Sequence, residues 1–410
     1  MKNAARQSSP FAEILARIAG REKAFPPNGI VRDEWAAIVS HWVQSPATPP
    51  LFLDRQKARE WRAWLNKGGL TLPADFSALP FPPPAKPRFT FIDLFAGVGG
   101  FRIALQGLGG KCVFSSEWNK PAQKTYFDNF GETPFGDITR IPAEAVPDHD
   151  ILCGGFPCQA FSIAGKKGGF ADSRGTLFFE IARILKAKQP AAFFLENVKG
   201  LMSHRGGRTL AAILAILRDE LGYFVPDPQI VRAEDFGVPQ KRGRLYIVGF
   251  HPRTGVRAFA YPRPLSRKAA LRDIKETNVS ARYYLSTVYL NSLRRHRARH
   301  ESLGNGFGFE IVPDDAVANT IVIGGMGRER NLVVDGGPAD YTPVTHIRGE
   351  INREGIRRMT PREWARLQGF PDAFRVHRSD AQAYRQFGNS VAVPAIRATA
   401  ERLLAALRKR

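Results

Sequence analysis

The chain has few cysteines, and their scarcity narrows the classes of protein to which it can belong. Only Cys112, Cys153 and Cys158 occur among the 410 residues. So few thiols do not support a disulfide framework. No CxxC pair is present and the histidines are scattered, so the sequence contains no zinc-binding pattern. We therefore expect neither structural disulfides nor a metal site.

Long apolar runs are also absent. No apolar stretch approaches the roughly 20 residues that a membrane-spanning helix needs. The opening MKNAARQSSP lacks the apolar region of a signal peptide. These features predict a cytoplasmic protein without a membrane partner. The chain of 410 residues is 43% hydrophobic, which is enough for roughly two to three domains of about 150 residues each.

Acidic residues are scarce relative to basic ones. The chain carries 60 Lys and Arg residues against 38 Asp and Glu residues, which gives a formal net charge of +22. A strong positive field favours polyanionic partners, and nucleic acid above all. The composition therefore predicts a nucleic-acid-binding protein.

The first part of the chain is predicted to be a helical extension, residues 1–76. Its tryptophans, Trp35, Trp42, Trp61 and Trp64, are expected in the core of a small module rather than stacked on bases. DNA contact, partner contact and a structural cap stay open as roles for this extension. A proline-rich linker, residues 77–88 (SALPFPPPAKPR), follows it. Helical spacing is found at Phe11–Ala19, Val31–Val43 and Arg55–Leu65.

From residue 89 the pattern changes to alternating strands and helices, which predicts an α/β fold with a mostly parallel sheet. We expect a catalytic domain at 89–253, completed by 380–410, and a smaller domain at 254–379. The expected strands are Phe89–Leu94, Lys111–Ser115, Asp150–Cys153, Ala192–Leu195 and Leu245–Phe250. The expected helices are Phe101–Leu108, Pro121–Phe130, Thr176–Lys188, Arg208–Leu221, Pro361–Gln368 and Pro394–Leu407.

Periodicity breaks down between His251 and Arg357. This stretch is rich in Arg and Gly, and we expect short strands at most. Two glycine-rich segments, GNGFGF (Gly304–Phe309) and IGGMGRER (Ile323–Arg330), are typical of loops. Arginine, glycine and aromatic residues together suit a surface that follows nucleic acid closely.

A glycine-rich turn follows the first expected strand, in FIDLFAGVGGF (Phe91–Phe101). Its GxGG pattern is not the GxGxxG fingerprint of dinucleotide-binding proteins. Glu117 ends the second strand, where a carboxylate can hold ribose hydroxyls, and Asp137 follows the second helix. A ligand with a ribose, an adenine and a positive sulfonium fits this arrangement, and S-adenosylmethionine is such a ligand.

Cys158 lies on a Gly/Pro loop after the third expected strand, in CGGFPCQAFSIAG. This position points to the ligand crevice at the carboxyl ends of the strands. Glu196, in LENVKG, ends another strand at the same edge. A thiolate nucleophile beside a carboxylic acid suits addition to a heteroaromatic ring. Arg242 and Arg244 are candidates for the positive charge that a thiolate needs.

These segments, taken together and in order, resemble the DNA (cytosine-5)-methyltransferases of bacterial restriction–modification systems. The resemblance covers the chain from about Phe89 to its C-terminus. It rests on DLFAGVGG, SEWN, GDI, GGFPCQAFS, DSRGTLFFEIARI, LENV, GVPQKRGRLYIVGF, MTPREWARLQGFPDAF and YRQFGNSVAVP. It implies a Rossmann-like S-adenosylmethionine-dependent methyltransferase fold with a smaller target-recognition domain and a helical N-terminal extension.

The resemblance also implies roles for individual residues. Cys158 would add to C6 of a flipped cytosine and Glu196 would contact N3, while Arg242 and Arg244 would hold the active-site loop and the cytosine carbonyl. Glu117 would take the ribose of S-adenosylmethionine. The residues expected to bind this cofactor are Phe95, Gly97, Gly99, Glu117, Trp118, Asp137, Ile138, Pro157, Asn389, Ser390 and Val391. Those expected to contact double-stranded DNA are Gln159, Ser162, Gln240, Asn305 and Arg328.

The segment RHESLGNGFGFEI (Arg299–Ile311) is similar to a branch of the family that modifies palindromes beginning with CC, such as CCGG or CCWGG. The expected protein is a monomer, associated with the nucleoid, that protects DNA from a cognate restriction endonuclease. Two alternatives stay open: cytosine-5 methylation of transfer RNA, and a DNA-binding regulator on a methyltransferase scaffold. The long Arg/Gly-rich region argues against the first, and the intact Cys158 and Glu196 argue against the second.

Overall fold

The computed structural model describes residues 29–44, 51–67, 76, 78–157, 177–266, 268–306, 308–324, 327–338 and 349–408. The helix expected at Phe11–Ala19 lies outside these residues, and so do Cys158, Gln159 and Ser162. In the described part of the chain, no helix combines the length and the apolar character that crossing a membrane requires.

The chain forms two compact units. The first consists of residues 1–229, 245–261 and 400–410, and the second of residues 230–244 and 262–399. The helical extension therefore belongs to the first unit. Residues 380–399, which were expected to complete the catalytic domain, group with the second unit instead. The reason is packing between helices α11 (Asp380–Asn389) and α10 (Pro361–Leu367), where the rings of Trp364 and Tyr384 lie 4.8 Å apart.

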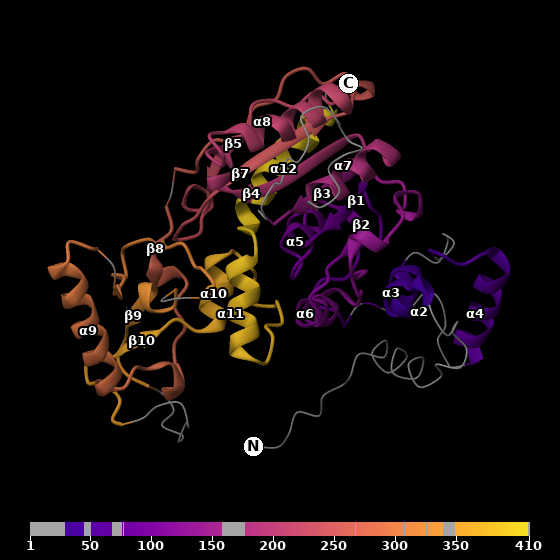
Figure 1. The fold of residues 1–410 in the computed structure, drawn as a ribbon. Helices are drawn as coiled ribbons and strands as arrows, with labels where there is room; N and C mark the ends of the chain where they lie inside the picture. The colour runs from indigo at the N-terminus through magenta and orange to yellow at the C-terminus, as the bar shows by residue number, and fades with distance from the viewer. Residues whose placement is uncertain are drawn as a thin grey trace. The chain divides into compact units, whose positions relative to one another are not determined.

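A six-stranded sheet forms the framework of the fold, and it confirms the predicted α/β class (Figure 1). β1 pairs in parallel with β2 and β3, and β3 pairs in parallel with β4. The central strands are buried along nearly their whole length, which is why their sequences are continuous apolar runs. The strand order is β2 (Gly110–Ser116), β1 (Phe89–Leu94), β3 (Ile151–Gly155), β4 (Ala192–Val198), β7 (Gly243–Phe250) and β5 (Gln229–Arg232).

The helices of this part begin and end at residue types that favour helix ends, as α6 illustrates. In α6, the Asn119 side chain accepts a hydrogen bond from Ala122 N, and Gly131 ends the helix with a positive φ of 65°. The helix expected at Arg208–Leu221 is α8 followed by one π-helical turn, Ile216–Glu220. The helices of this part are α5 (Gly100–Gln106), α6 (Lys120–Phe130), α7 (Leu177–Lys188), α8 (Arg208–Ala215) and α12 (Val393–Arg408).

The N-terminal extension contributes helices α2 (Ile30–Asp33), α3 (Trp35–Gln44) and α4 (Arg55–Lys67). Trp42 is 3% exposed, so it is a core residue, as predicted, and cannot stack on a base. The side chains of Trp61 and Trp64 are outside the described part of the structure.

The second unit holds helix α9 (Thr287–Ser302), which the sequence analysis did not predict. Only Leu290 and Leu293 of this Arg-rich helix are buried, so its apolar periodicity is too short to stand out. The unit also contains two small sheets, antiparallel β9 (Leu332–Val334) with β10 (Ile356–Arg358) and parallel β6 (Gln240–Lys241) with β8 (Ala318–Asn319). Its core cluster consists of Leu285, Leu290, Leu293, Phe309, Leu332 and Ile356.

A buried ion pair ties β10 to the start of α10. The Arg357 guanidinium donates to both carboxylate oxygens of Glu363, at 2.8 and 2.7 Å, and also pairs with Asp335. Glu363 in turn accepts from Thr360 N at 2.7 Å, and Thr360 Oγ1 accepts from Glu363 N at 3.1 Å, so the two residues form a capping box. Both charged side chains of the pair are fully buried.

We predict that Arg357→Met destabilises the protein by about 3–5 kcal/mol, because it leaves the Glu363 carboxylate buried without its counter-ion. Urea denaturation followed by circular dichroism measures the loss. The matched control is Asp372→Ala, which removes the exposed pair with Arg366 and should cost at most about 1 kcal/mol. Equal losses for the two variants would contradict the prediction.

Candidate active site and cofactor site

The turn after β1 has a backbone geometry that lets a ligand approach the main chain closely. Gly97 and Gly99 have positive φ angles of 55° and 88°, and Phe95 has a φ of 56° although it is not a glycine. A Cβ atom on Gly99 would lie within 3.0 Å of the Phe130 ring, whereas one on Gly97 would meet nothing within 4 Å. Gly99 is therefore required for packing, and Gly97 borders open space on which a ligand can lie.

Glu117 holds this turn against the end of β2. Its carboxylate accepts hydrogen bonds from Gly97 N at 2.9 Å and from Asn119 N at 2.7 Å. Burial raises the pKa of Glu117, although these backbone bonds act in the opposite direction. A carboxylate has about four lone-pair sites, so both oxygens retain the capacity to accept from ribose hydroxyls. The structure thus brings Gly97 and Glu117 together, as a nucleoside site requires.

The residues expected around the adenine come from two places in the chain. Trp118 follows β2, and Asp137 with Ile138 follows the segment after α6. Trp118 is 74% exposed and follows Glu117 directly. Asp137 is exposed and caps a short 3-10 helix (Ile138–Arg140) by accepting from Thr139 N at 3.0 Å. Ile138 is buried, and its carbonyl accepts from the Arg183 guanidinium at 2.8 Å. An exposed indole, two carboxylates and an apolar side chain are groups that fit an adenosine with a positive charge.

The ends of β3 and β4 define the expected position of the nucleophile. Gly155 of β3 is in register with Glu196 of β4, and Glu196 is 8% exposed. Pro157 is exposed and directly precedes Cys158, which lies outside the described residues. Cys158 follows the last residue of β3, Gly155, by three positions in the sequence.

Asn197 is a residue of this region that the sequence analysis missed. Its side-chain nitrogen donates to the Phe156 carbonyl at 2.9 Å, and the side chain is buried. It therefore fixes the backbone two residues before Cys158. Its position directly after Glu196 in the LENV motif was the sequence feature that could have identified it.

The sequence analysis also did not single out Asp93, which lies in β1. It is fully buried, and neither carboxylate oxygen has a hydrogen-bond partner in the described part of the chain. Burial raises its pKa well above the ordinary value.

The other two cysteines do not have the surroundings of a nucleophile. Cys112 and Cys153 are free thiols, and both are buried. Burial raises the pKa of each, so they stay protonated. In the part of the chain that the structure describes, no group of side chains has the arrangement of a metal site.

Arg242 and Gln240 are buried in the second unit, where both bind backbone carbonyls. The Arg242 guanidinium donates to the backbone carbonyl of Ser390 at 2.5 Å and to that of Gly388 at 3.3 Å. Gln240 donates to Leu367 O at 2.8 Å, while its oxygen accepts from Ile321 N at 3.1 Å. Both side chains bind backbone within the unit, and their roles toward the cytosine and DNA stay predictions.

The remaining predicted residues of the second unit range from exposed to buried. Arg244 is half-buried and donates to the Gly243 carbonyl at 3.0 Å. Asn389 is exposed at the end of α11, whereas Ser390 and Val391 are buried. Asn305 is exposed just after α9. Arg328 is exposed, with its guanidinium 5.4 Å from the centre of the Tyr384 ring.

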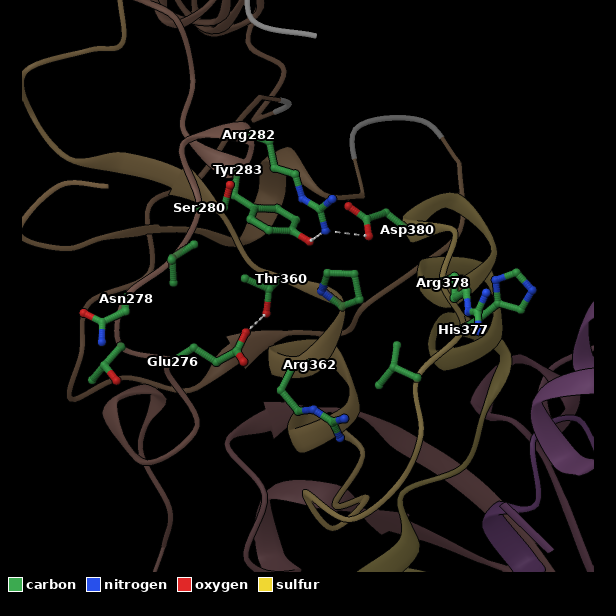
Figure 2. Close-up of a pocket in the computed structure, with 14 residues that line it drawn as sticks. Glu276, Asn278, Ser280, Arg282, Tyr283, Thr360, Arg362, His377, Arg378 and Asp380 are labelled. Atoms are coloured by element: carbon green, nitrogen blue, oxygen red, sulfur yellow. Dashed lines mark hydrogen bonds and ion pairs between the residues drawn. The ribbon is translucent and has the colours of Figure 1, made fainter. Parts of the chain in front are cut away.

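A cavity of about 360 Å³ also lies in the second unit, outside the predicted site (Figure 2). Three arginines and two carboxylates are among the residues that line it. Arg282 donates to Tyr283 Oη at 2.5 Å and pairs with Asp380 at 3.3 Å. Thr360 Oγ1 donates to Glu276 at 2.5 Å. None of the residues that line it is a predicted site residue.

Comparison with known proteins assigns the family. Residues 89–405 match the family model described as C-5 cytosine-specific DNA methylase. The chain belongs to this family, and it is a DNA cytosine-5-methyltransferase of the restriction–modification type. Members of the family take the methyl group from S-adenosylmethionine. The family is defined by DNA methylation, so the transfer-RNA and regulator alternatives are not favoured.

The chain is 65% identical over 325 residues to the type II methyltransferase M.HpaII of Haemophilus parainfluenzae, which covers 78% of this chain and 91% of that protein. It is 44% identical over 381 residues to M.SsoII of Shigella sonnei, covering 90% and 95%. Among solved structures, the Dnmt2 methyltransferase of S. pombe aligns with a TM-score of 0.58 at 19% identity, over 78% of this chain and all of that one. This last likeness shows the methyltransferase fold.

We predict that the two glycines of the turn respond differently to alanine. Gly99→Ala should lower the free energy of unfolding by about 1–3 kcal/mol, because its Cβ overlaps the Phe130 ring. Gly97→Ala should cost about 1–2 kcal/mol for its left-handed backbone, yet weaken S-adenosylmethionine binding more than tenfold if its open side faces the cofactor. Thermal unfolding and titration calorimetry separate the two effects. Unchanged cofactor affinity in Gly97→Ala would contradict the assignment of the open space beside Gly97 to the cofactor.

Proposed function

We propose that the loop beginning at Pro157 carries Cys158 to the carboxyl edge of the sheet beside Glu196, and that these two residues perform the chemistry on a flipped cytosine. The observation that supports this is the register of Gly155 with Glu196, which puts the root of the nucleophile loop next to the acid. The buried, protonated state of Cys112 and Cys153 leaves Cys158 as the thiol that can react.

In this proposal, base flipping costs a few kcal/mol and exposes the ring. The Cys158 thiolate forms a bond to C6. The C5–C6 π electrons shift to the C4–C5 bond, and Glu196 gives a proton to N3. C5 thereby becomes nucleophilic. S-adenosylmethionine, when bound, supplies an electrophilic methyl group on its sulfonium. Transfer of this methyl group to C5 would break its bond to sulfur and leave S-adenosylhomocysteine. Loss of the C5 proton to a base would then re-form the C5–C6 double bond, and the C6–sulfur bond would break to release Cys158 as thiolate. N3 would return its proton to Glu196, which regenerates the acid.

The cofactor would be held mainly by groups of the first unit. Glu117 would accept from the ribose hydroxyls, Trp118 would stack on the adenine, and Asp137 with Ile138 would border its edge. Gly97 would let the ligand approach the backbone. The other residues of the first unit proposed to line this site are Phe95, Gly99 and Pro157. Within the second unit, Arg242 binds the Ser390 carbonyl and so positions Asn389, Ser390 and Val391, which stay predicted cofactor-binding residues. Arg242 and Arg244 stay candidates for holding the active-site loop and the cytosine carbonyl.

We further propose that the second unit selects a short DNA palindrome that contains CC, such as CCGG or CCWGG. Support comes from the exposed Asn305 and Arg328 and from the exposed arginines Arg295 and Arg299 on α9. Methylation of that site would protect DNA from a cognate endonuclease. A monomer suffices, since one chain carries both chemical groups.

The first experiment is expression in a bacterial host that lacks cytosine methylation, beside the Cys158→Ser variant, followed by bisulfite sequencing of the host DNA. We expect methylated cytosines in one short motif, and none with the variant, because a serine hydroxyl is a much weaker nucleophile than a thiolate. Methylation that persists in the variant would rule out Cys158 as the nucleophile. Methylated motifs without a CC core would refute the proposed target.

Glu196→Gln tests the proton donor. We predict that kcat falls by about 10²–10⁴-fold, because an amide cannot protonate N3, while DNA affinity stays near that of the wild type. Methyl transfer from radiolabelled S-adenosylmethionine measures kcat, and gel shift measures DNA binding. The control is Glu144→Gln, an exposed acid of the same unit, which should leave both unchanged. A kcat within twofold of wild type would remove Glu196 from the mechanism.

A further inference from the structure

The segment 29–44 lies before the part of the chain that matches the family, which begins at residue 89. Yet every residue of α3 from Ala37 to Gln44 is buried (α3 in Figure 1). With 3.6 residues per turn, this leaves no exposed face over two turns. A helix that reads DNA must present a face to the groove, so this part of α3 is built into the first unit instead.

A buried ionic cluster joins α3 to the sheet. The Glu132 carboxylate lies 2.9 Å from His41 Nε2 and 2.7 Å from Arg102 Nη1, and it accepts from Ser115 Oγ at 3.0 Å. Burial alone would raise the pKa of Glu132, but Arg102 and His41 outweigh it and lower the pKa to about 2. Arg102 also donates to Gln44 Oε1 at 3.2 Å. Removing any one member leaves the others buried and uncompensated, so the cluster fixes α3 in one position.

From this position α3 and the turn before it bind the backbone of the loop that follows α6. Ser40 Oγ accepts from Thr133 N at 2.9 Å, and Glu34 Oε2 accepts from Gly136 N at 2.9 Å. The approach at Gly136 is close, since a Cβ atom there would lie 2.7 Å from Glu34 Oε1. The loop residue between them, Phe135, is fully buried, with its ring 5.0 Å from that of His41.

The same loop links the two acids assigned to the cofactor, because it pairs with the end of β2 at Glu117 and leads directly into Asp137. Phe135 N donates to Ser115 O at 2.8 Å, and its carbonyl accepts from Glu117 N at 2.7 Å, so the loop runs beside the end of β2. Asp137 directly follows Gly136. One short segment, bound on one side by α3 and on the other by β2, therefore sets the separation between the ribose-binding and adenine-binding carboxylates.

We propose that Glu34 is a positioning residue for cofactor binding, which it supports by holding the Gly136 amide so that Asp137 and Ile138 border the adenine. The N-terminal extension thus contributes to the cofactor site although it touches no cofactor itself. The inference rests on the proposed placement of S-adenosylmethionine beside Glu117, Trp118 and Asp137.

The test compares Glu34→Ala, Glu34→Gln and Asp33→Ala in the full-length protein. Titration calorimetry with S-adenosylmethionine and with S-adenosylhomocysteine, without DNA, gives the dissociation constants. Glu34→Ala should weaken both by about tenfold, because the Gly136 amide loses its buried acceptor. Glu34→Gln keeps an acceptor oxygen and should stay within about threefold of wild type. Asp33→Ala breaks the neighbouring exposed pair with Arg140 and should have no effect.

Affinity for duplex DNA and thermal unfolding, measured on the same samples, separate positioning from general destabilisation. The proposal requires that DNA affinity stay unchanged while cofactor affinity falls at temperatures far below unfolding. Wild-type cofactor affinity in a folded Glu34→Ala protein would overturn it. A wild-type protein that binds no cofactor would instead refute the proposed function on which it rests.

If Glu34→Ala does not fold, Gly136→Ala carries the test. Its Cβ pushes against Glu34 Oε1, so a folded Gly136→Ala protein should also bind the cofactor more weakly, by about tenfold. The total loss of affinity in the double variant Gly136→Ala with Glu34→Gln should then be smaller than the sum of the two single losses, since the residues are in contact. Unchanged affinity in Gly136→Ala, or strict additivity, would overturn the proposal.

Discussion

Parallel pairing of β1, β3 and β4 aligns their carboxyl ends along one edge of the sheet, and every element of the proposed site in the first unit starts from that edge. Asp93 of β1 is opposite Cys153 of β3, and Gly155 of β3 is opposite Glu196 of β4. The glycine turn after β1, the end of β3 and the acid Glu196 are therefore neighbours, although more than 90 residues separate the turn from Glu196 in the chain. A shift in this register would place Glu196 away from the root of the Cys158 loop.

Carboxylates that bind backbone amides recur as the means of fixing the loops. Glu117 holds the glycine turn through Gly97 N, and Glu34 holds the loop before Asp137 through Gly136 N. Glu363 does the same in the second unit, where it caps α10 through Thr360 N. Such bonds are charge-assisted and have fixed geometry, so each loop takes one conformation without needing a ligand to order it. For a transfer reaction, this means that less binding free energy is spent on ordering the site.

Sequence reasoning succeeded where the local sequence pattern by itself specifies the local structure. The apolar run Phe89–Leu94 is a strand with the predicted limits, and the glycines after it adopt the positive φ angles that the turn needs. It did not predict that Arg242 and Gln240 bind buried backbone carbonyls, because a motif does not reveal the partners of a polar side chain. It also missed α9, whose arginines hide a helix with only Leu290 and Leu293 buried. The contacts of Glu34 and His41 span 74 to 102 residues of sequence, and no local pattern encodes them.

The N-terminal extension shows why such long-range polar contacts matter to the site. On a bare sheet, Arg102 and Glu132 would form a solvated pair worth at most about 1 kcal/mol. With α3 packed over them, both charges lose their water and must be satisfied by His41, Gln44 and Ser115. An apolar interface tolerates small shifts of one helix over another, whereas a buried ion cluster is satisfied in only one arrangement. Glu34 therefore meets Gly136 at a fixed distance, and the extension can act on the cofactor loop without direct contact with the cofactor.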